Sequence, residues 1–264
     1  MPAKGKLVAL TNIQVTKSKY RVSKQSVFLE NTFLRPLVKG VDIERYHLKE
    51  SGILVPFPYD ELHTRIPLSQ KELDEKSPKL VEYLSTYEQL LNSQTNYNNK
   101  IIGSKEKEFY ALARVGDYSF GEYFVAFRDN TKWQACVVHK IKTSWGKQRP
   151  CFQNHAVSIS QDSNGHYIEK DEAHYICAIL NAPIVAEYLQ NSSDSRSFKV
   201  RPPVHIPKYN AHNPVHHRLS ILSQIAHIYY NDKKRIDRID CLVDLLYIEL
   251  CKRKPSIHYT LPLQ

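Results

Sequence analysis

Glycine is scarce in this chain, with 8 among 264 residues, and no glycine-rich loop follows a predicted strand. The chain therefore lacks the backbone cradle that holds phosphates, as well as the dinucleotide-binding fingerprint. The Glu-x-Lys triplet of metal-dependent nucleases is also missing. Its loose variants begin at Asp74 and Asp232, and both fit the charged face of a helix. The sequence therefore offers no catalytic, cofactor-binding or metal-binding residue.

Paired cysteines and long apolar runs are absent as well. The cysteines are odd in number, at 5, and no two have C-x-x-C spacing, so we expect no zinc site. Cys136, Cys177 and Cys241 lie in apolar runs, which favours reduced and mostly buried thiols. No run approaches the roughly 20 apolar residues of a membrane helix, and the start lacks the pattern of a signal peptide. We therefore expect a cytoplasmic protein without a membrane partner.

Acidic residues are outnumbered, since 37 Lys and Arg face 27 Asp and Glu, for a formal net charge of +10. Such a surplus favours a polyanionic partner. A first cationic patch is a predicted loop, residues 140–155, which contains no acid. Its basic residues and its aromatic residues, which we expect to be exposed, are Lys140, Lys142, Lys147, Arg149, Trp145 and Phe152.

A second cationic patch, residues 195–208, also lacks acids, and it follows two predicted helices within the stretch 173–210. Its basic residues are Arg196, Lys199, Arg201 and Lys208. Cations of this kind neutralise phosphates and release counterions. The basic side chains of the two patches are interleaved with aromatic residues that could stack on an unstacked base: Tyr118, Phe120, Trp145 and Phe198. Solvated lysines and core aromatic residues remain the alternative for each residue taken alone.

The hydrophobic pattern predicts an α/β (α+β) fold: a mixed, mostly antiparallel sheet with flanking helices and a C-terminal helical pair. Ser77-Pro78 marks a helix start, with the serine hydroxyl as N-cap. We expect a first region at residues 1–208 and a C-terminal helical region at 209–264. The predicted strands are residues 6–13, 26–29, 53–57, 109–115, 123–127, 133–139 and 156–160, and the predicted terminal helices are 216–229 and 236–250.

Histidines cluster at 212, 216 and 217, before the first of these terminal helices. Pro214 lies between His212 and His216 and disfavours the helix that would put both on one face. We expect exposed imidazoles here rather than a metal site. Asp240, Asp244 and Glu249 indicate a solvated helix face.

Several segments together resemble a known family. Residues 33–46, 113–127, 134–138, 172–208 and 216–250 resemble, in this order, the C-terminal half of bacterial N6-adenine DNA methyltransferases. This half is the TaqI-like specificity, or target-recognition, domain of type IIG restriction-modification enzymes and related phage-defence methylases. The resemblance implies a reader of double-stranded DNA sequence, and it covers nearly the whole chain.

The catalytic half of such enzymes has no counterpart here. Arg201-Pro202-Pro203-Val204 lacks the preceding Asp, Asn or Ser and the following aromatic residue of an adenine pocket. S-adenosylmethionine would therefore bind a missing catalytic domain or a partner, and this chain would not be an enzyme by itself. The residues that we expect to contact DNA are Lys140, Lys142, Trp145, Lys147, Arg149, Arg196, Lys199 and Arg201.

Two other functions stay open at this point. The terminal helices could dock onto a separate methyltransferase or endonuclease subunit, which would make the chain a protein-interaction module. The chain could also be a stand-alone nuclease or methyltransferase, which the missing motifs disfavour.

Overall fold

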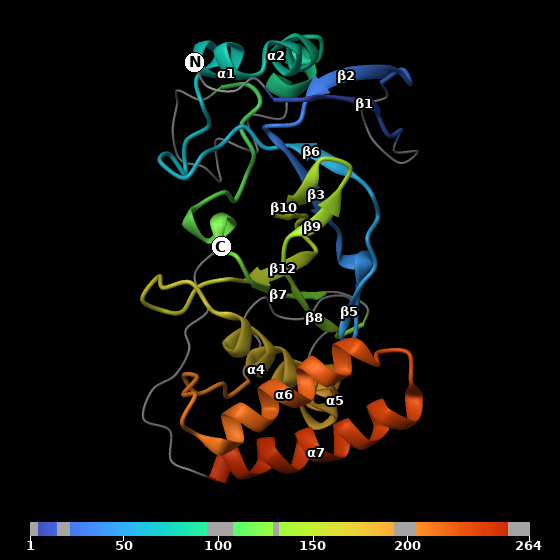
Figure 1. Ribbon diagram of the computed structural model, residues 1–264, viewed down its shortest axis with the longest axis vertical. Coiled ribbons are helices and arrows are strands. Elements are labelled where there is room, and N and C mark those ends of the chain that lie inside the picture. Colours follow the sequence, from blue (N-terminus) through green and yellow to red (C-terminus); the bar gives the residue numbers. More distant parts are fainter. Residues whose placement is uncertain (1–4, 15–21, 94–107, 129–131, 193–203, 253–264) are drawn as a thin grey trace. The chain divides into compact units, whose positions relative to one another are not determined.

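The fold is mixed α/β, with helices and several small, mostly antiparallel sheets. The computed structural model describes residues 5–14, 22–93, 108–128, 132–192 and 204–252 (Figure 1). The chain forms two compact units that are interleaved in sequence, whereas we expected a division after residue 208. Unit 1 comprises Met1–Arg35, Leu54–Phe120 and Ser144–Gly146, and unit 2 comprises Pro36–Ile53, Gly121–Thr143 and Lys147–Gln264.

Unit 1 packs an antiparallel strand pair against short helices. Strand β1 pairs with β2 through its whole length, from Leu7↔Glu30 to Thr11↔Ser26. A cluster of apolar side chains that includes Leu29, Leu73 and Leu80 joins the strands to the helices. The elements of unit 1 are β1 (Leu7–Thr11), β2 (Ser26–Glu30), β6 (Leu54–Pro56), α1 (Gln70–Lys76), α2 (Pro78–Ser85) and a 3-10 helix η2 (Asp117–Phe120).

Helices α1 and α2 of unit 1 begin in different ways. Helix α1, which we did not predict, has a capping box: Ser69 Oγ accepts from the Glu72 N–H, and the Glu72 carboxylate accepts from the Ser69 N–H. Ser77 precedes α2, but its hydroxyl makes no capping bond. Glu30 caps α2 instead, since its carboxylate accepts from the N–H groups of Lys79 (3.2 Å) and Leu80 (3.1 Å).

Unit 2 contains the larger core. Strand β3 (Leu34–Val38) starts in unit 1 and ends in unit 2, where it pairs in parallel with β11 through Leu37 and Val38. The β12-β7-β8 sheet is antiparallel. The remaining elements are η1 (Gly40–Asp42), β4 (Ile43–Glu44), β5 (His47–Leu48), β7 (Phe124–Arg128), β8 (Ala135–Val138), β9 (Ile141–Thr143), β10 (Gly146–Gln148), β11 (Cys151–Phe152), β12 (Ala156–Ile159), α4 (Lys170–Asn181), α5 (Pro183–Ser192), α6 (Pro214–Ile228) and α7 (Lys233–Lys252).

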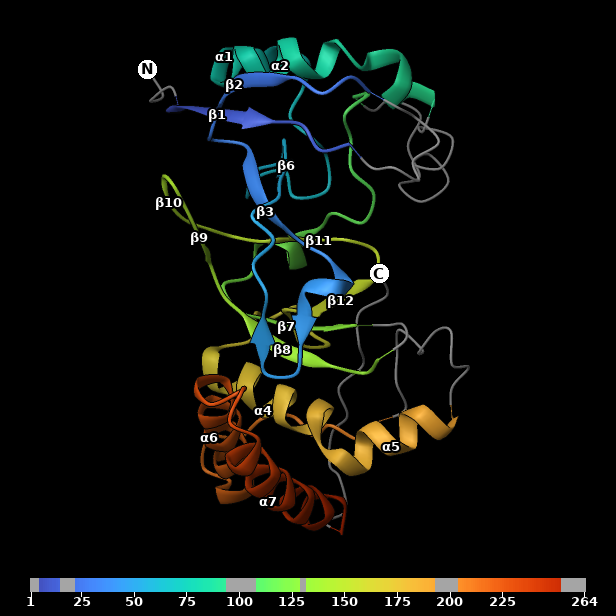
Figure 2. The same cartoon turned by 90° about the vertical axis from the view of Figure 1, so that its right-hand side faces the viewer.

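Helix α4 is the centre of unit 2. Its residues 172–181 are all buried, as expected of a helix that is covered on every side. The β7–β8 strands lie on one side of α4 and the α6–α7 pair lies on the other (Figure 2). Asn181 at its end bonds Ala135 of β8 in both directions, accepting from its N–H (3.0 Å) and donating to its carbonyl (2.7 Å).

One predicted strand was wrong. Residues 109–115 form turns and bends, although their apolar content suggested a strand. Backbone groups there bond to a side chain rather than to a neighbouring strand. The Tyr59 hydroxyl accepts from the Leu112 N–H (2.7 Å) and donates to the Leu112 carbonyl (3.2 Å). Arg114 has a φ of 58°, in the left-handed region, which a strand does not contain.

Two expectations about burial were also wrong. Cys241 is exposed, although its apolar run predicted a buried thiol, whereas Cys136 and Cys177 are buried. His216 is buried with 4% exposure: it accepts from the Asn210 N–H (3.0 Å) and stacks on Tyr175. Among the described residues, no helix combines the length and the apolar character that crossing a membrane requires.

Candidate nucleic-acid interface

The first cationic patch contains structure where we predicted a loop. Strands β9 and β10 form a hairpin within it, and β11 follows. Gly146 opens β10 with a φ of +124°, which a residue with a side chain rarely adopts. Lys142 on β9 and Lys147 on β10 are both exposed. Among the described residues, neither lysine forms an ion pair, so both charges face solvent.

Lys140, just before this hairpin, has an acidic neighbour. Its ammonium lies 3.3 Å from the carboxylate of Glu122, and His139 Nε2 lies 3.2 Å from the same oxygen. The hydrogen bond from His139 and then that from Lys140 lower the pKa of Glu122. Glu122 is open to solvent, so the pair is weak and exchangeable, but it partly neutralises the charge that Lys140 can offer to a phosphate.

The aromatic residues near this patch are less exposed than we predicted. Trp145 is partly buried and packs against the apolar cluster of unit 1. Phe152 packs against Phe124, and Phe120 is buried with 5% exposure. Arg149 is partly buried. A base could not stack on Phe120 without local opening, because its ring already contacts Phe57.

The second cationic patch lies mostly outside the described residues. Arg196, Lys199, Arg201 and Phe198 fall in the gap 193–203, so their predicted contacts with DNA stay predictions. Lys208 is described, and it donates to the carboxylates of Asp162 (2.7 Å) and Glu172 (3.2 Å). It therefore holds two buried acids rather than presenting an open positive charge.

The ion-pair network around Lys208 is built into the fold. Burial opposes ionisation of Asp162, but hydrogen bonds from Lys208 and from the N–H groups of His166 and Asn164 outweigh it and lower its pKa to about 2. Glu172 comes from the first turn of α4. These contacts join Lys208 to the first turn of α4, so the charge of Lys208 stabilises the fold.

Two further polar clusters were not apparent from the sequence. Arg45 forms a bidentate ion pair with Asp240 (2.6 and 2.7 Å), so Asp240 is not part of the solvated face that we predicted. The second cluster contains His174, Ser223 and His227. His227 Nε2 accepts from the Val137 N–H at 2.9 Å, and His174 Nδ1 lies 3.1 Å from Ser223 Oγ. No sequence motif marks either cluster, because each joins residues that lie far apart in the chain.

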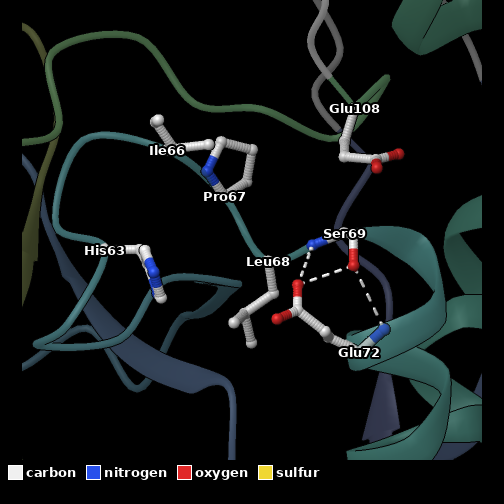
Figure 3. Close-up of a pocket in the computed structure, with 7 residues that line it drawn as sticks. All are labelled: His63, Ile66, Pro67, Leu68, Ser69, Glu72 and Glu108. Carbon is white, nitrogen blue, oxygen red and sulfur yellow. Dashed lines mark hydrogen bonds between the residues drawn. The ribbon is translucent and has the colours of Figure 1, made fainter.

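A hollow of about 440 Å³ lies in unit 1, at the start of α1. Figure 3 shows the Glu72 carboxylate turned back toward Ser69 at its edge. Glu108, the other acid at this hollow, accepts from the Gln70 N–H at 3.1 Å. Both carboxylates therefore serve the helix start, so the hollow lacks a free acid–base pair. The other lining residues are His63, Ile66, Pro67 and Leu68.

Among the described residues, the β9–β10 hairpin leaves two lysine side chains exposed. No group of three or more His, Cys, Asp or Glu among the described residues could hold a metal ion. No protein-family model matches the chain, and no curated protein matches it either.

Proposed function

We propose that this chain binds double-stranded DNA as the target-recognition part of an adenine-specific methyltransferase or restriction-modification system whose catalytic half lies elsewhere. The observation that carries the proposal is the β9–β10 hairpin. It presents Lys142 and Lys147 to solvent, and the segment 140–155 around it has basic residues but no acid. The overall surplus of positive charge supports the same partner.

A short two-stranded hairpin with basic side chains suits DNA physically. The major groove accepts a β-ribbon, and lysine side chains there reach phosphates and base edges. Phosphate contacts fix position and supply most of the affinity, whereas base contacts supply specificity. Arg149 follows β10 directly, and arginine is the residue that most often reads guanine.

The test is a fluorescence-anisotropy titration of a mixed-sequence duplex at several salt concentrations. We expect affinity to fall steeply with salt, since bound phosphates release counterions. The Lys142→Ala/Lys147→Ala variant should reduce the slope of log K against log salt by about 2, roughly one unit for each phosphate that a lysine no longer neutralises.

The matched control removes the same charge from another part of unit 2. Lys233 and Lys234 are exposed at the start of α7, and the Lys233→Ala/Lys234→Ala variant should leave the slope unchanged. Equal decreases in both variants would mean that charge alone, and not the hairpin, attracts DNA. Binding that is absent at low salt, or indifferent to salt, would contradict the proposed function.

A second pair of measurements concerns the rest of the proposal. An Arg196→Ala/Lys199→Ala/Arg201→Ala variant tests the second patch, and full retained affinity would remove that patch from the interface. Incubation with a methyl donor, Mg²⁺ and plasmid should give no turnover. Turnover by the isolated chain would contradict the assignment of catalysis to a missing half.

A further inference from the structure

Helix α7 carries apolar residues on two different faces. One face is buried in unit 2 and contains Ile239, Val243 and Leu250. The other contains Leu242 and Leu245, which are 49% and 65% exposed. A core helix needs only the first face, so the two exposed leucines are unexplained by the packing of unit 2.

The exposed leucines belong to a longer stripe with regular spacing. Its members follow one another at alternating intervals of three and four residues, the spacing that keeps a row of side chains on one side of a helix and forms the seam of a coiled coil. All of them are exposed. The stripe consists of Arg235, Arg238, Leu242, Leu245, Glu249 and Lys252.

The order of the four central residues of the stripe is self-complementary. When a second α7 lies antiparallel to the first, Leu242 of one helix meets Leu245 of the other. In the same register Arg238 meets Glu249, and each contact occurs twice because the arrangement is two-fold symmetric. A parallel pair would instead place each Arg238 beside its own copy and each Glu249 beside its own copy, which is repulsive.

We propose that this stripe is a homodimer interface, in which α7 packs antiparallel against α7 of a second copy of the chain. The charge pattern is the reason for choosing a second copy over an unrelated protein, because the four central residues of the stripe complement one another in one register. The outermost contact, Arg235 with Lys252, is repulsive and limits the strength of the dimer. The proposal does not rest on DNA binding.

Sedimentation velocity over a concentration series tests the apolar centre of the stripe. The Leu245→Lys variant should raise the dissociation constant by about ten-fold or more, because a buried lysine without a partner is costly. Ile248→Lys is the matched control, since Ile248 is exposed on the same helix but lies off the stripe. Both positions are exposed, so thermal unfolding of the two variants should stay close to that of the parent protein.

Charge reversal tests the register. Arg238→Glu places a second carboxylate opposite Glu249, and Glu249→Arg places a second guanidinium opposite Arg238, so each single variant should dimerise more weakly. Mixing the two variants should restore dimers. In the mixed dimer the substituted position 238 of one chain meets the substituted position 249 of the other, and the unchanged Glu249 of the first chain meets the unchanged Arg238 of the second, so both contacts join opposite charges. The doubly reversed chain, Arg238→Glu/Glu249→Arg, also keeps both contacts opposite in sign and should dimerise like the parent protein. The off-stripe pair Lys233→Glu and Asp237→Arg should show neither the weakening nor the rescue.

Lys252→Glu should strengthen the dimer by removing the repulsion from Arg235.

Three outcomes would overturn the proposal. The first is a protein that stays monomeric at its highest soluble concentration, which would leave the stripe to a different partner or to solvent. The second is a dimer that Leu245→Lys does not weaken, which would place the interface on another surface. The third is single charge-reversal variants that weaken the dimer without rescue in the doubly reversed chain, which would rule out the antiparallel register.

Discussion

The core of unit 1 is almost entirely apolar, whereas the core of unit 2 contains many polar side chains. Among the described residues, unit 1 buries Glu30 and Ser77, and every other buried polar or charged residue belongs to unit 2. Those of unit 2 are Asp42, Ser160, Asp162, Glu172, His174, Asn181, His216, Ser220 and Ser223. Most of them bond directly across elements.

The contrast follows from what each core must join. In unit 1, short helices lie on a strand pair, and apolar contacts satisfy that packing. In unit 2, strand ends, loops and helices α5, α6 and α7 meet around α4, and some backbone groups there have no partner in a helix or sheet. Buried side chains supply those partners, since an unsatisfied buried group costs about 1–3 kcal/mol. Unit 2 should therefore depend on protonation state and on single polar atoms more than unit 1.

Acidification should show the largest difference. Burial lowers the pKa of His174 from 6.5 to about 3 and that of His227 from 6.5 to about 4. The folded protein favours the neutral imidazoles, so the protein has its full stability above pH 6.5. The free energy of unfolding then decreases as the pH falls toward 4 for His227 and toward 3 for His174. At the steepest point two protons are taken up on unfolding, and the free energy of unfolding should fall by about 2.7 kcal/mol per pH unit.

Denaturant unfolding at a series of pH values measures this slope. The control is His227→Gln, whose amide offers a donor and an acceptor in place of the Nδ1 and Nε2 contacts of His227. It should remove about half of the slope between pH 6 and 4. Asp162, whose pKa is lowered from 3.8 to about 2, keeps its stabilisation through this window and loses it mainly as the pH falls from about 3.8 toward 2. A stability that is flat from pH 7 to 4 would contradict the buried, neutral histidines.

A single buried amide should have the next largest effect. Asn181→Ala leaves the Ala135 N–H without its partner and opens a cavity, and we expect a loss of about 3 kcal/mol in the free energy of unfolding. Asn181→Leu fills the space but still leaves the N–H unpaired, so it should recover only part of the loss. If Asn181→Leu matches the parent protein in a denaturant melt, the amide serves only to fill volume.

The smallest effects concern the start of α2 in unit 1. Glu30→Ala removes the carboxylate that caps Lys79 and Leu80, and we expect a loss of about 1–2 kcal/mol. Ser77→Ala should change stability by less than about 0.5 kcal/mol, because the buried Ser77 hydroxyl has no hydrogen-bond partner in the described structure. Thermal unfolding of both variants gives the comparison, and a larger loss for Ser77→Ala would identify the serine as the true cap.

The sequence predicted the elements that local pattern determines. The mixed α/β class, the strands at 124–128, 135–138 and 156–159, and the helices of unit 2 followed from apolar periodicity. The capping box of Ser69 and Glu72 was also readable, since Ser followed three residues later by Glu is a helix-start signature. Helix α1 was therefore predictable although we did not predict it.

What could not be read from the sequence depends on contacts between distant residues. The apolar stretch 109–115 predicts a strand, but backbone groups of Leu112 hydrogen-bond to the hydroxyl of the distant Tyr59. The sequence predicts an exposed His216, but Tyr175 stacks on its ring. It also predicts a solvated Asp240, but Arg45, far away in the chain, forms an ion pair with it. Of the predicted DNA contacts, Lys142 and Lys147 are exposed as an interface requires. The contacts of Arg196, Lys199 and Arg201 lie outside the described residues.

The interleaving of the two units has a consequence for synthesis on the ribosome. Unit 1 draws its last segment from Ser144–Gly146, so Trp145 joins the apolar cluster only after more than half of the chain has been made. Neither unit can be excised by a single cut, because the chain passes between them repeatedly. The early segments of unit 1 therefore cannot complete their packing until residues 144–146 have been synthesised, and such non-local contacts slow folding. Proteolytic fragments or truncations that end before residue 144 should lack a complete unit 1.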